Sequence, residues 1–242
     1  MTPPRIRRII APLRMGRSDE RLETLDVDGR TVAYRDVGAG PIVILAHGSG
    51  ASHRAWAPVV AALRHDYRVL TPDLLGYGRS EPSRVNARFH PWSDLGALIA
   101  LAERADAPVH LVGHSYGGAL ALEAARSLGR RARSLTLIDP VAFHLMRLHM
   151  SSHPERTAAV YRGITTATRL IAGQSSPQPA RAIVDELALI LADAHVRVLP
   201  GAGHMSPITH PAEIAALVAE HIDANDAATD GYRESRNRAS MA

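Results

Sequence analysis

The 242-residue chain contains no cysteine, so disulfides, cysteine nucleophiles and thiolate metal sites are excluded. Lysine is also absent and every basic side chain is arginine, which indicates a compositional bias of the source rather than a function. No run of about 18 uncharged apolar residues occurs, so we expect no membrane-spanning helix. With 46% apolar residues, the chain has the length and composition of one sizeable globular domain.

Positive charge is concentrated at the N-terminus. Residues 1–22 hold six arginines and two acids, and six minus two equals the formal net charge of +4 of the whole chain. The remaining sequence is therefore close to neutral, which argues against a nucleic-acid-binding core. The arginines are Arg5, Arg7, Arg8, Arg14, Arg17 and Arg21, and the acids are Asp19 and Glu20.

Residues 1–21 are interpreted as a basic N-terminal extension that is disordered or loosely attached. The segment lacks the long apolar core of a signal peptide, so we expect a cytoplasmic protein. Its arginine-rich, mildly amphipathic character leaves targeting to a membrane surface or an organelle as the alternative. At the other end, residues 224–242 are small and polar, which predicts a frayed C-terminal tail. The folded domain is expected over residues 22–223.

Between these ends, strand-like and helix-like segments alternate. A hairpin is predicted first, because alternating apolar and polar residues flank Asp28-Gly29. From residue 41 onward the alternation predicts an α/β fold, with a mostly parallel sheet, helices on both faces and right-handed crossovers. Strands are expected at 21–27, 31–37, 41–46, 68–72, 109–112, 134–138, 169–172 and 196–199, and helices at 56–63, 92–105, 119–128, 180–192 and 212–222.

The most informative motif is at residues 113–118, which read Gly-His-Ser-Tyr-Gly-Gly and contain the pattern Gly-x-Ser-x-Gly. A predicted strand precedes it and a predicted helix follows it, which is the context that a nucleophile elbow requires. The serine would lie on a strained turn with its hydroxyl above the sheet, and the helix N-terminus would add amides and a positive dipole end. Ser115 is therefore the predicted nucleophile. A chance match of the pattern in a loop is the alternative, which this context disfavours.

A serine hydroxyl needs a base within hydrogen-bond reach. Among the 13 histidines, His204 is distinctive because it lies in a glycine-rich loop, 200–205, after the last predicted strand. Glycines allow a sharp turn that carries the imidazole over the sheet, so His204 is the predicted base rather than a structural loop histidine. His114 is adjacent to the nucleophile in sequence, so its side chain should point elsewhere, and we interpret it as a packed histidine.

Acyl transfer also needs hydrogen-bond donors aimed at the oxyanion. The first predicted donor is the backbone amide of Tyr116, the residue after the nucleophile. The second should come from the loop His47-Gly48-Ser49-Gly50 after the third strand, where small residues leave amides accessible. We assign this role to the Ser49 amide. A simple tight turn is the alternative interpretation of the loop.

Taken together and in this order, these motifs resemble those of the α/β-hydrolase superfamily in its single-domain form. The resemblance implies an α/β-hydrolase sheet with helices on both faces and a triad in the chain order serine, acid, histidine. It is specific for the fold and weak for the substrate. The segment 73–80 is structural in this family, and we assign it no catalytic role. The matching stretches are 47–50, 73–80, 113–118 and 201–204, within a resemblance that covers roughly residues 22–222.

The acid of the triad departs from the family pattern. The resemblance places it in the loop after the strand at 169–172, where this chain has Ser176. A serine cannot hold an imidazolium by charge, although its hydroxyl could orient the ring. Other members that resemble this chain carry the acid one strand earlier, where this chain has Asp139. The alternatives are that Asp139 only caps the chain near Pro140, or that a serine–histidine pair without an acid keeps reduced activity.

The helical cap of the family is shortened in this chain. Only residues 140–168 separate two predicted strands, and a crossover connection itself needs about 10–12 residues. We therefore expect a shallow, wet site that favours small or flexible acyl substrates. The shortening is equally compatible with an eroded member of the family that has weak or no turnover.

The sequence thus predicts a serine hydrolase that cleaves carboxylic esters through an acyl-enzyme on Ser115, with His204 and Asp139 completing the triad. No cofactor, metal or nucleic acid is expected, and the partner is a small acyl substrate. The serine argues against epoxide hydrolases and haloalkane dehalogenases, which resemble this chain but use an aspartate at this position. A carbon–carbon bond hydrolase or lyase on the same triad and a non-catalytic ligand-binding homologue stay open, as do the natural substrate and the oligomeric state.

Overall fold

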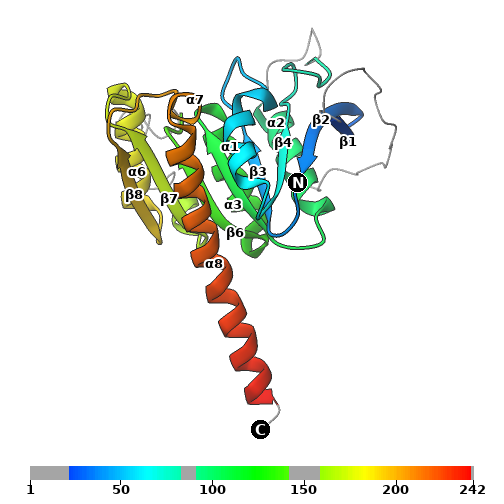
Figure 1. Ribbon diagram of the computed structural model, residues 1–242, viewed down its shortest axis with the longest axis vertical. Coiled ribbons are helices and arrows are strands. Elements are labelled where there is room, and N and C mark those ends of the chain that lie inside the picture. Colours follow the sequence, from blue (N-terminus) through cyan, green and yellow to red (C-terminus); the bar gives the residue numbers. More distant parts are fainter. Residues whose placement is uncertain (1–21, 83–90, 142–158, 241–242) are drawn as a thin grey trace.

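The computed structural model describes residues 22–82, 91–141 and 159–240, with the backbone alone for 91–93 and 227–240. Within these residues eight strands form one sheet in the order β1-β2-β4-β3-β5-β6-β7-β8 (Figure 1). The pairs β1–β2 and β2–β4 are antiparallel and every other pair is parallel. The predicted fold class, a mostly parallel α/β-hydrolase sheet with helices, is confirmed.

The predicted elements are present, with ends that differ by a few residues except at the last helix, which is much longer than predicted. The strands are β1 (Leu22–Val27), β2 (Arg30–Val37), β3 (Ile42–Ala46), β4 (Arg68–Pro72), β5 (Val109–His114), β6 (Ala132–Ile138), β7 (Ala167–Gly173) and β8 (Ala194–Leu199). The described helices are η1 (His53–Trp56), α1 (Ala57–Leu63), α2 (Pro91–Arg104), α3 (Tyr116–Leu128), η2 (Gly129–Arg131), α6 (Gln178–Ile190), α7 (Ser206–Thr209) and α8 (Pro211–Ser240).

The N-terminal hairpin turns at the predicted dipeptide. Asp28 and Gly29 have φ values of 53° and 76°, and Val27 pairs with Arg30 across the turn. Two successive residues with positive φ are the signature of a type I′ turn, whose twist matches that of the flanking strands. The hairpin therefore forms for the reason that its Asp-Gly sequence indicates.

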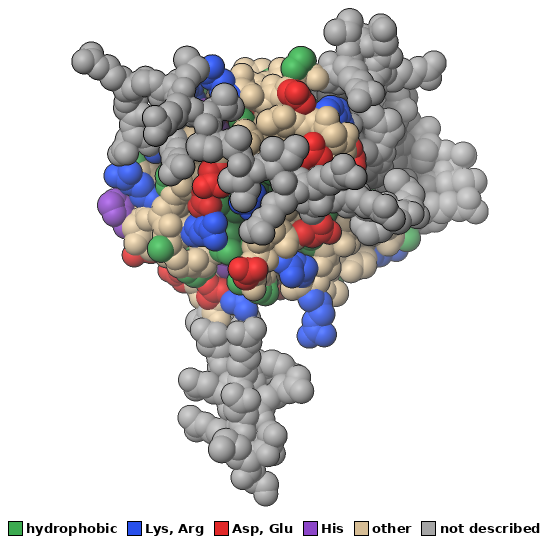
Figure 2. Space-filling model, turned by 90° about the vertical axis from the view of Figure 1, so that its right-hand side faces the viewer, with side chains coloured by type: hydrophobic (Ala, Val, Ile, Leu, Met, Phe, Trp, Pro, Cys, Tyr) green, Lys and Arg blue, Asp and Glu red, His purple; other side chains and the backbone are tan. Residues whose placement is uncertain are grey.

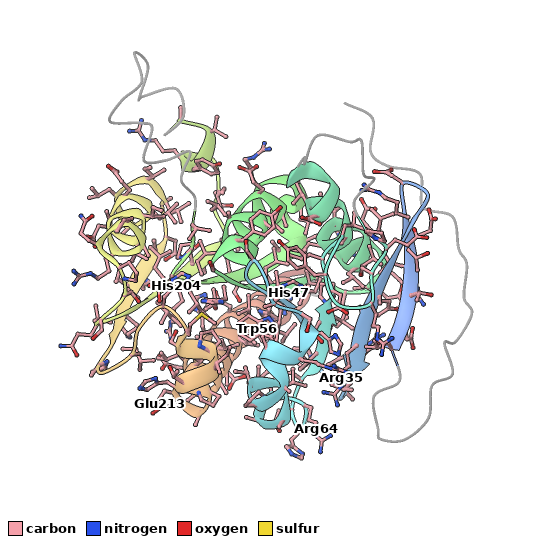
Figure 3. The ribbon with its side chains drawn as sticks, turned by 90° about the horizontal axis from the view of Figure 1, so that it is seen from above. Arg35, His47, Trp56, Arg64, His204 and Glu213 are labelled. Carbon is pink, nitrogen blue, oxygen red and sulfur yellow. The ribbon has the colours of Figure 1, made fainter. Side chains whose placement is uncertain are left out.

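Helices cover both faces of the sheet and create two apolar cores. Seen from above in Figure 3, α1 and α8 (cyan and orange) lie on one side and α2, α3 and α6 (green and yellow) on the other. Strand β3 serves both cores because its side chains alternate between the faces. Its residues Ile42, Ile44 and Ala46 pack in the larger core, while Val43 and Leu45 pack in the smaller one. A strand buried on both faces explains the continuous apolar run in the sequence.

The C-terminal segment differs from the expected frayed tail, because α8 continues to Ser240. Its first half is held by apolar residues four apart, Ile214, Val218 and Ile222, which are buried in the smaller core. No proline follows Ile222, and residues 223–240 include four alanines and three arginines, which favour a helix, although Gly231 lies among them. Figure 1 shows the second half extending beyond the body of the domain.

The described surface carries charges of both signs. On the face in Figure 2, arginines and acidic side chains are interspersed. This mixture is what a body of nearly neutral net charge produces. The predicted basic extension, 1–21, lies outside the described residues. In the part of the chain that is described, no helix combines the length and apolarity needed to cross a bilayer.

Two glycines of the elbow are fixed by close approach of the backbone. A Cβ on Gly117 would lie 2.2 Å from the carbonyl oxygen of Ala46, and one on Gly113 would lie 2.2 Å from the carbonyl oxygen of Gly117. Helix α3 therefore packs on the ends of β3 and β5 at a distance that only a hydrogen at these positions allows. This contact brings the start of α3 to the carboxyl ends of the central strands.

Replacing Gly117 by alanine should destabilise the fold, because its Cβ would force two backbone segments apart. We expect Gly117→Ala to lower the free energy of unfolding by about 3 kcal/mol, as overpacking in a tight core does. The control is Gly163→Ala, where the nearest atom to a new Cβ is 3.9 Å away. Urea denaturation of both variants measures the difference. Equal stabilities would contradict the close approach.

Candidate active site

Ser115 joins the end of β5 to the start of α3 in a strained conformation. Its φ is 54° and its ψ is −119°, values that residues with a side chain rarely adopt. Backbone hydrogen bonds hold this conformation, since the Ser115 amide donates to Ile138 O at 3.0 Å and the Ser115 carbonyl accepts from the Val141 amide at 3.1 Å. The strain, of the order of 1–3 kcal/mol, is thus offset by attachment to the end of β6. The side chain itself is half-buried.

His204 lies in the loop after β8, and its side chain reaches Ser115. Its Nε2 lies 3.0 Å from Ser115 Oγ, within hydrogen-bond distance. The loop after β8 is held in place by the Ser175 amide, which donates to Ala202 O at 2.8 Å, and it turns at Gly201 with a φ of 71°. Figure 3 places His204 near the centre of the molecule, between the two helical layers. The structure therefore brings the predicted nucleophile and the predicted base together.

His114 packs inside the site. It is buried, as expected, but its Nε2–H donates to the backbone carbonyl of His204 at 2.7 Å, and the two rings lie 5.1 Å apart. Burial lowers the pKa of His114 to about 4, so the ring is neutral and donates from one nitrogen. Sequence reasoning missed this contact, because the partner lies 90 residues further along the chain. His114 fixes the backbone of the loop that carries His204.

Asp139 lies at the end of β6 and is fully buried. Its Oδ2 accepts a hydrogen bond from Ser176 Oγ at 2.8 Å and a longer one from the Gly173 amide at 3.4 Å. Burial raises the pKa of the Asp139 carboxyl, while Ser176, the Gly173 amide and His204 oppose that rise. The two positions that the sequence offered for the acid therefore meet in space.

Two buried polar atoms of the site lack a partner among the described residues. They are Oδ1 of Asp139 and Nδ1 of His204. With Nε2 accepting the serine proton, Nδ1 of a neutral histidine carries the hydrogen, so this pair is one acceptor and one donor. The two atoms are chemically complementary but are not hydrogen-bonded to each other in this structure. His204 acts on the Asp139 carboxyl only through its charge, which lowers the pKa of that group.

The loop after β3 is fixed by a buried histidine. His47 accepts a hydrogen bond from the Leu74 amide at its Nε2, at 3.1 Å, and its Nδ1–H donates to the Gly48 carbonyl at 2.8 Å. Burial lowers the pKa of His47, which favours this neutral tautomer. The same Gly48 carbonyl also accepts from the Ala51 amide at 3.2 Å. The orientation of the peptide unit between residues 48 and 49 is therefore set.

This orientation bears on the predicted oxyanion donors. In a trans peptide the N–H points opposite to the C=O, so the Ser49 amide points away from His47 and Ala51. Within the described part of the chain, that amide donates no hydrogen bond. The loop also abuts the nucleophile, because a Cβ on Gly48 would lie 3.1 Å from Ser115 Cβ. The other predicted donor, the Tyr116 amide, belongs to the first residue of α3.

Asp94 of α2 is a site-supporting residue that the sequence did not reveal. It is buried, and it accepts hydrogen bonds from the Tyr116 hydroxyl at 2.8 Å and from the Leu75 amide at 2.9 Å. Burial raises the pKa of its carboxyl. Asp94 thus ties the elbow to the segment 73–80, in which Asp73 in turn accepts from the amide and ring of His53. The segment 73–80 is therefore connected to the elbow through Asp94.

The expected reduced cap, 140–168, is described only in part, because residues 142–158 lie outside the described ranges. Outside those gaps, the chain holds no group of three or more histidine and acidic side chains arranged to bind a metal ion. The chemistry that the described residues can perform is nucleophilic attack by a serine, assisted by a histidine and by amides at a helix start.

Comparison with known proteins supports the same fold. The model of the alpha/beta hydrolase family matches residues 43–174, which is more than half of the chain. A membrane phospholipase A, described as a bacterial virulence factor, has a similar structure, with a TM-score of 0.73 over 86% of this chain and 87% of that one. At 19% sequence identity this likeness concerns the fold alone.

Two curated relatives share more sequence. The chain is similar to a 2-hydroxy-6-oxo-2,4-heptadienoate hydrolase of Pseudomonas putida, with 40% identity over 110 residues, 44% of this chain and 40% of that protein. It is also similar to a probable protein phosphatase methylesterase 1 of Caenorhabditis elegans, with 30% identity over 168 residues, 62% of this chain and 46% of that protein. The chain thus spans less than half the length of these relatives.

The pKa of His114 predicts a loss of stability in acid. Its value falls from 6.5 to about 4 on folding, so between these pH values the unfolded chain binds a proton that the folded chain does not. Stability is then lost as pH falls through this window, by on the order of 3 kcal/mol at most. Urea unfolding at about pH 7 and about pH 4.5 should show a smaller acid loss for His114→Gln than for the parent.

The matched control is His65→Gln, since His65 is exposed. We expect this variant to keep the acid loss of the parent. An equal acid loss in His114→Gln and the parent would show that His114 is not held neutral by its burial against His204.

Proposed function

The chain belongs to the alpha/beta hydrolase family, and from that premise we propose that it is a serine hydrolase that cleaves carboxylic esters through an acyl-enzyme on Ser115. One observation carries the proposal: Ser115 Oγ lies 3.0 Å from His204 Nε2, on a turn whose φ of 54° lifts the hydroxyl out of the sheet. A serine and a base at this distance form an activated nucleophile.

In the first half of the reaction, Ser115 Oγ attacks the acyl carbon and a bond forms between them. His204 Nε2 takes the serine proton as the C=O electrons move onto the oxygen. The tetrahedral intermediate then collapses, the bond to the leaving alkoxide breaks, and His204 returns the proton to the departing alcohol. In the second half, water attacks the acyl carbon while His204 takes its proton, and the bond between the acyl carbon and Ser115 Oγ breaks as His204 returns the proton to the serine and the carboxylic acid leaves.

The charge on the carbonyl oxygen calls for two donors. The Tyr116 amide at the start of α3 supplies one, with the positive end of the helix dipole behind it. The Ser49 amide supplies the other, because the hydrogen bonds to the Gly48 carbonyl turn it away from His47. Each such donor typically accounts for 10²–10³-fold in rate.

Asp139 completes the triad in this proposal. Its Oδ1 and His204 Nδ1 are not hydrogen-bonded in this structure, and we infer that they pair during the reaction, when the acid orients the ring and stabilises the imidazolium. Asp139 is fully buried, so the interaction acts in a low-dielectric environment where charge stabilisation is strong. If Asp139 only capped the chain near Pro140, its buried Oδ1 would have no hydrogen-bond partner among the described residues.

A second candidate is hydrolysis of a carbon–carbon bond on the same residues. The relative named a 2-hydroxy-6-oxo-2,4-heptadienoate hydrolase favours it, because that substrate has no ester and its hydrolysis must break a carbon–carbon bond. The relative named a methylesterase favours ester cleavage and matches more of this chain. Ester hydrolysis also depends less on a closed pocket than carbon–carbon bond hydrolysis does. A short cap and a half-buried Ser115 therefore favour ester hydrolysis.

Turnover of short-chain aryl esters, together with labelling by a fluorophosphonate probe, tests the proposal. We expect the parent to be labelled, Ser115→Ala to lose labelling and turnover, and His204→Ala to lose at least 10³-fold in kcat. Asp139→Asn should lose roughly 10³–10⁴-fold, as removal of an orienting acid does.

The control is His195→Ala, because His195 is 70% exposed and away from the serine. It should behave like the parent. A parent that is neither labelled nor active on esters, but cleaves a vinylogous 1,5-diketone, would favour the carbon–carbon alternative. A parent inert in every assay would contradict the hydrolase proposal.

A further inference from the structure

We propose that Ser176 is the positioning residue of Asp139, with the acid at the end of β6 and its support in the loop after β7. Ser176 stands in the loop after β7, where the family pattern would place the acid, and its hydroxyl holds the carboxylate that comes from the end of β6. The inference deepens the proposed function and rests on it.

The contact between the two side chains is buried and direct. Ser176 is 4% exposed and Asp139 is fully buried, and Ser176 Oγ donates to Asp139 Oδ2 at 2.8 Å. An ionised carboxylate accepts hydrogen bonds only, so the serine proton points at the acid. A hydrogen bond to a charged acceptor is about twice as strong as one between neutral groups. Ser176 therefore favours the ionised form that the imidazolium needs.

The backbone around Ser176 leaves the hydroxyl little freedom. The Ser176 amide donates to the Gly173 carbonyl at 3.0 Å, which closes a tight turn. A Cβ on Gly173 would lie 2.6 Å from Ser176 Oγ and 2.7 Å from Ala202 O. The neighbouring Ser175 amide donates to the same Ala202 carbonyl at 2.8 Å. The loop of Ser176 and the loop of His204 are thus packed as one unit.

The two carboxylate oxygens of Asp139 differ in their hydrogen bonds. Oδ2 is occupied by Ser176 and the Gly173 amide, while Oδ1 has no partner among the described residues. The titratable group that acts on this carboxylate is His204, whose backbone is held by His114. Because Ser176 fixes the rotation of the carboxylate, Oδ1 stays available to His204 Nδ1.

An exchange of the two side chains should therefore preserve the pair. With serine at 139 and aspartate at 176, one carboxylate and one hydroxyl still meet at the same place, now with the acid on the loop that is bonded to the histidine loop. With aspartate at both positions, two buried carboxylates share one site and repel each other, so one is protonated or the fold is weakened. The reciprocal exchange removes that repulsion.

Kinetics of four variants against the parent test the exchange: Ser176→Ala, Asp139→Ser, Ser176→Asp and the double variant Asp139→Ser/Ser176→Asp. Ser176→Ala should lower kcat about tenfold with KM unchanged. The double variant should be at least tenfold more active than Asp139→Ser. The control Ser175→Ala, at an exposed neighbour, should stay within twofold of the parent.

A measurement that does not depend on turnover separates this inference from the proposed function. Carbon-13 NMR of the Asp139 carboxyl should show a higher pKa in Ser176→Ala than in the parent and no change in Ser175→Ala. An inert parent would overturn the proposed function, while the titration still decides whether Ser176 holds the carboxylate. An unchanged Asp139 titration in Ser176→Ala, or an active parent whose double variant is no better than Asp139→Ser, would overturn the inference.

Discussion

The backbone at Ser115 holds a φ of 54°, and the rest of the site is arranged around that one residue. The conformation persists because it is bonded on both sides: its amide is bound to the end of β6 and its carbonyl to the segment that follows. The same hydrogen bonds bring Asp139, the next residue after Ile138, to the edge of the sheet where the serine lies. Strain at the nucleophile and placement of the acid are consequences of one strand pairing, since β5 and β6 are parallel neighbours that end together.

Buried neutral histidines extend this arrangement to the surrounding loops. His114 holds the His204 backbone, and His47 holds the Gly48 carbonyl. Burial lowers the pKa of both, so each ring keeps one donor and one acceptor. The carboxylates of Asp94 and Asp139 also hold neighbouring loops, because they accept hydrogen bonds from the Leu75 amide and from the Ser176 hydroxyl. We infer that the loops at the carboxyl ends of β3, β5, β7 and β8 are held by these buried polar groups rather than by apolar packing alone.

What the sequence could predict follows the range of the interactions involved. The hairpin, the elbow and the glycine-rich loop depend on neighbours in the chain, so their residues alone indicate them. The relation between Asp139 and Ser176 depends on a contact across 37 residues, which left two alternatives that the structure joins into one pair. The contact of His114 with His204 spans 90 residues and had no local signal. Helix α8 extends to Ser240, beyond the segment 212–222 that the apolar spacing predicts, because that spacing marks only the part of a helix that packs on the sheet.

If Ser115 is the nucleophile, Ser115 itself must become acylated during turnover. Rapid-quench mass spectrometry of the intact protein, mixed with an activated aryl ester, measures this directly. We expect an added acyl mass within the first turnover, located on the peptide that contains Ser115 and decaying as water releases the acid. Ester turnover without any acyl adduct, or with an adduct on another residue, would contradict it.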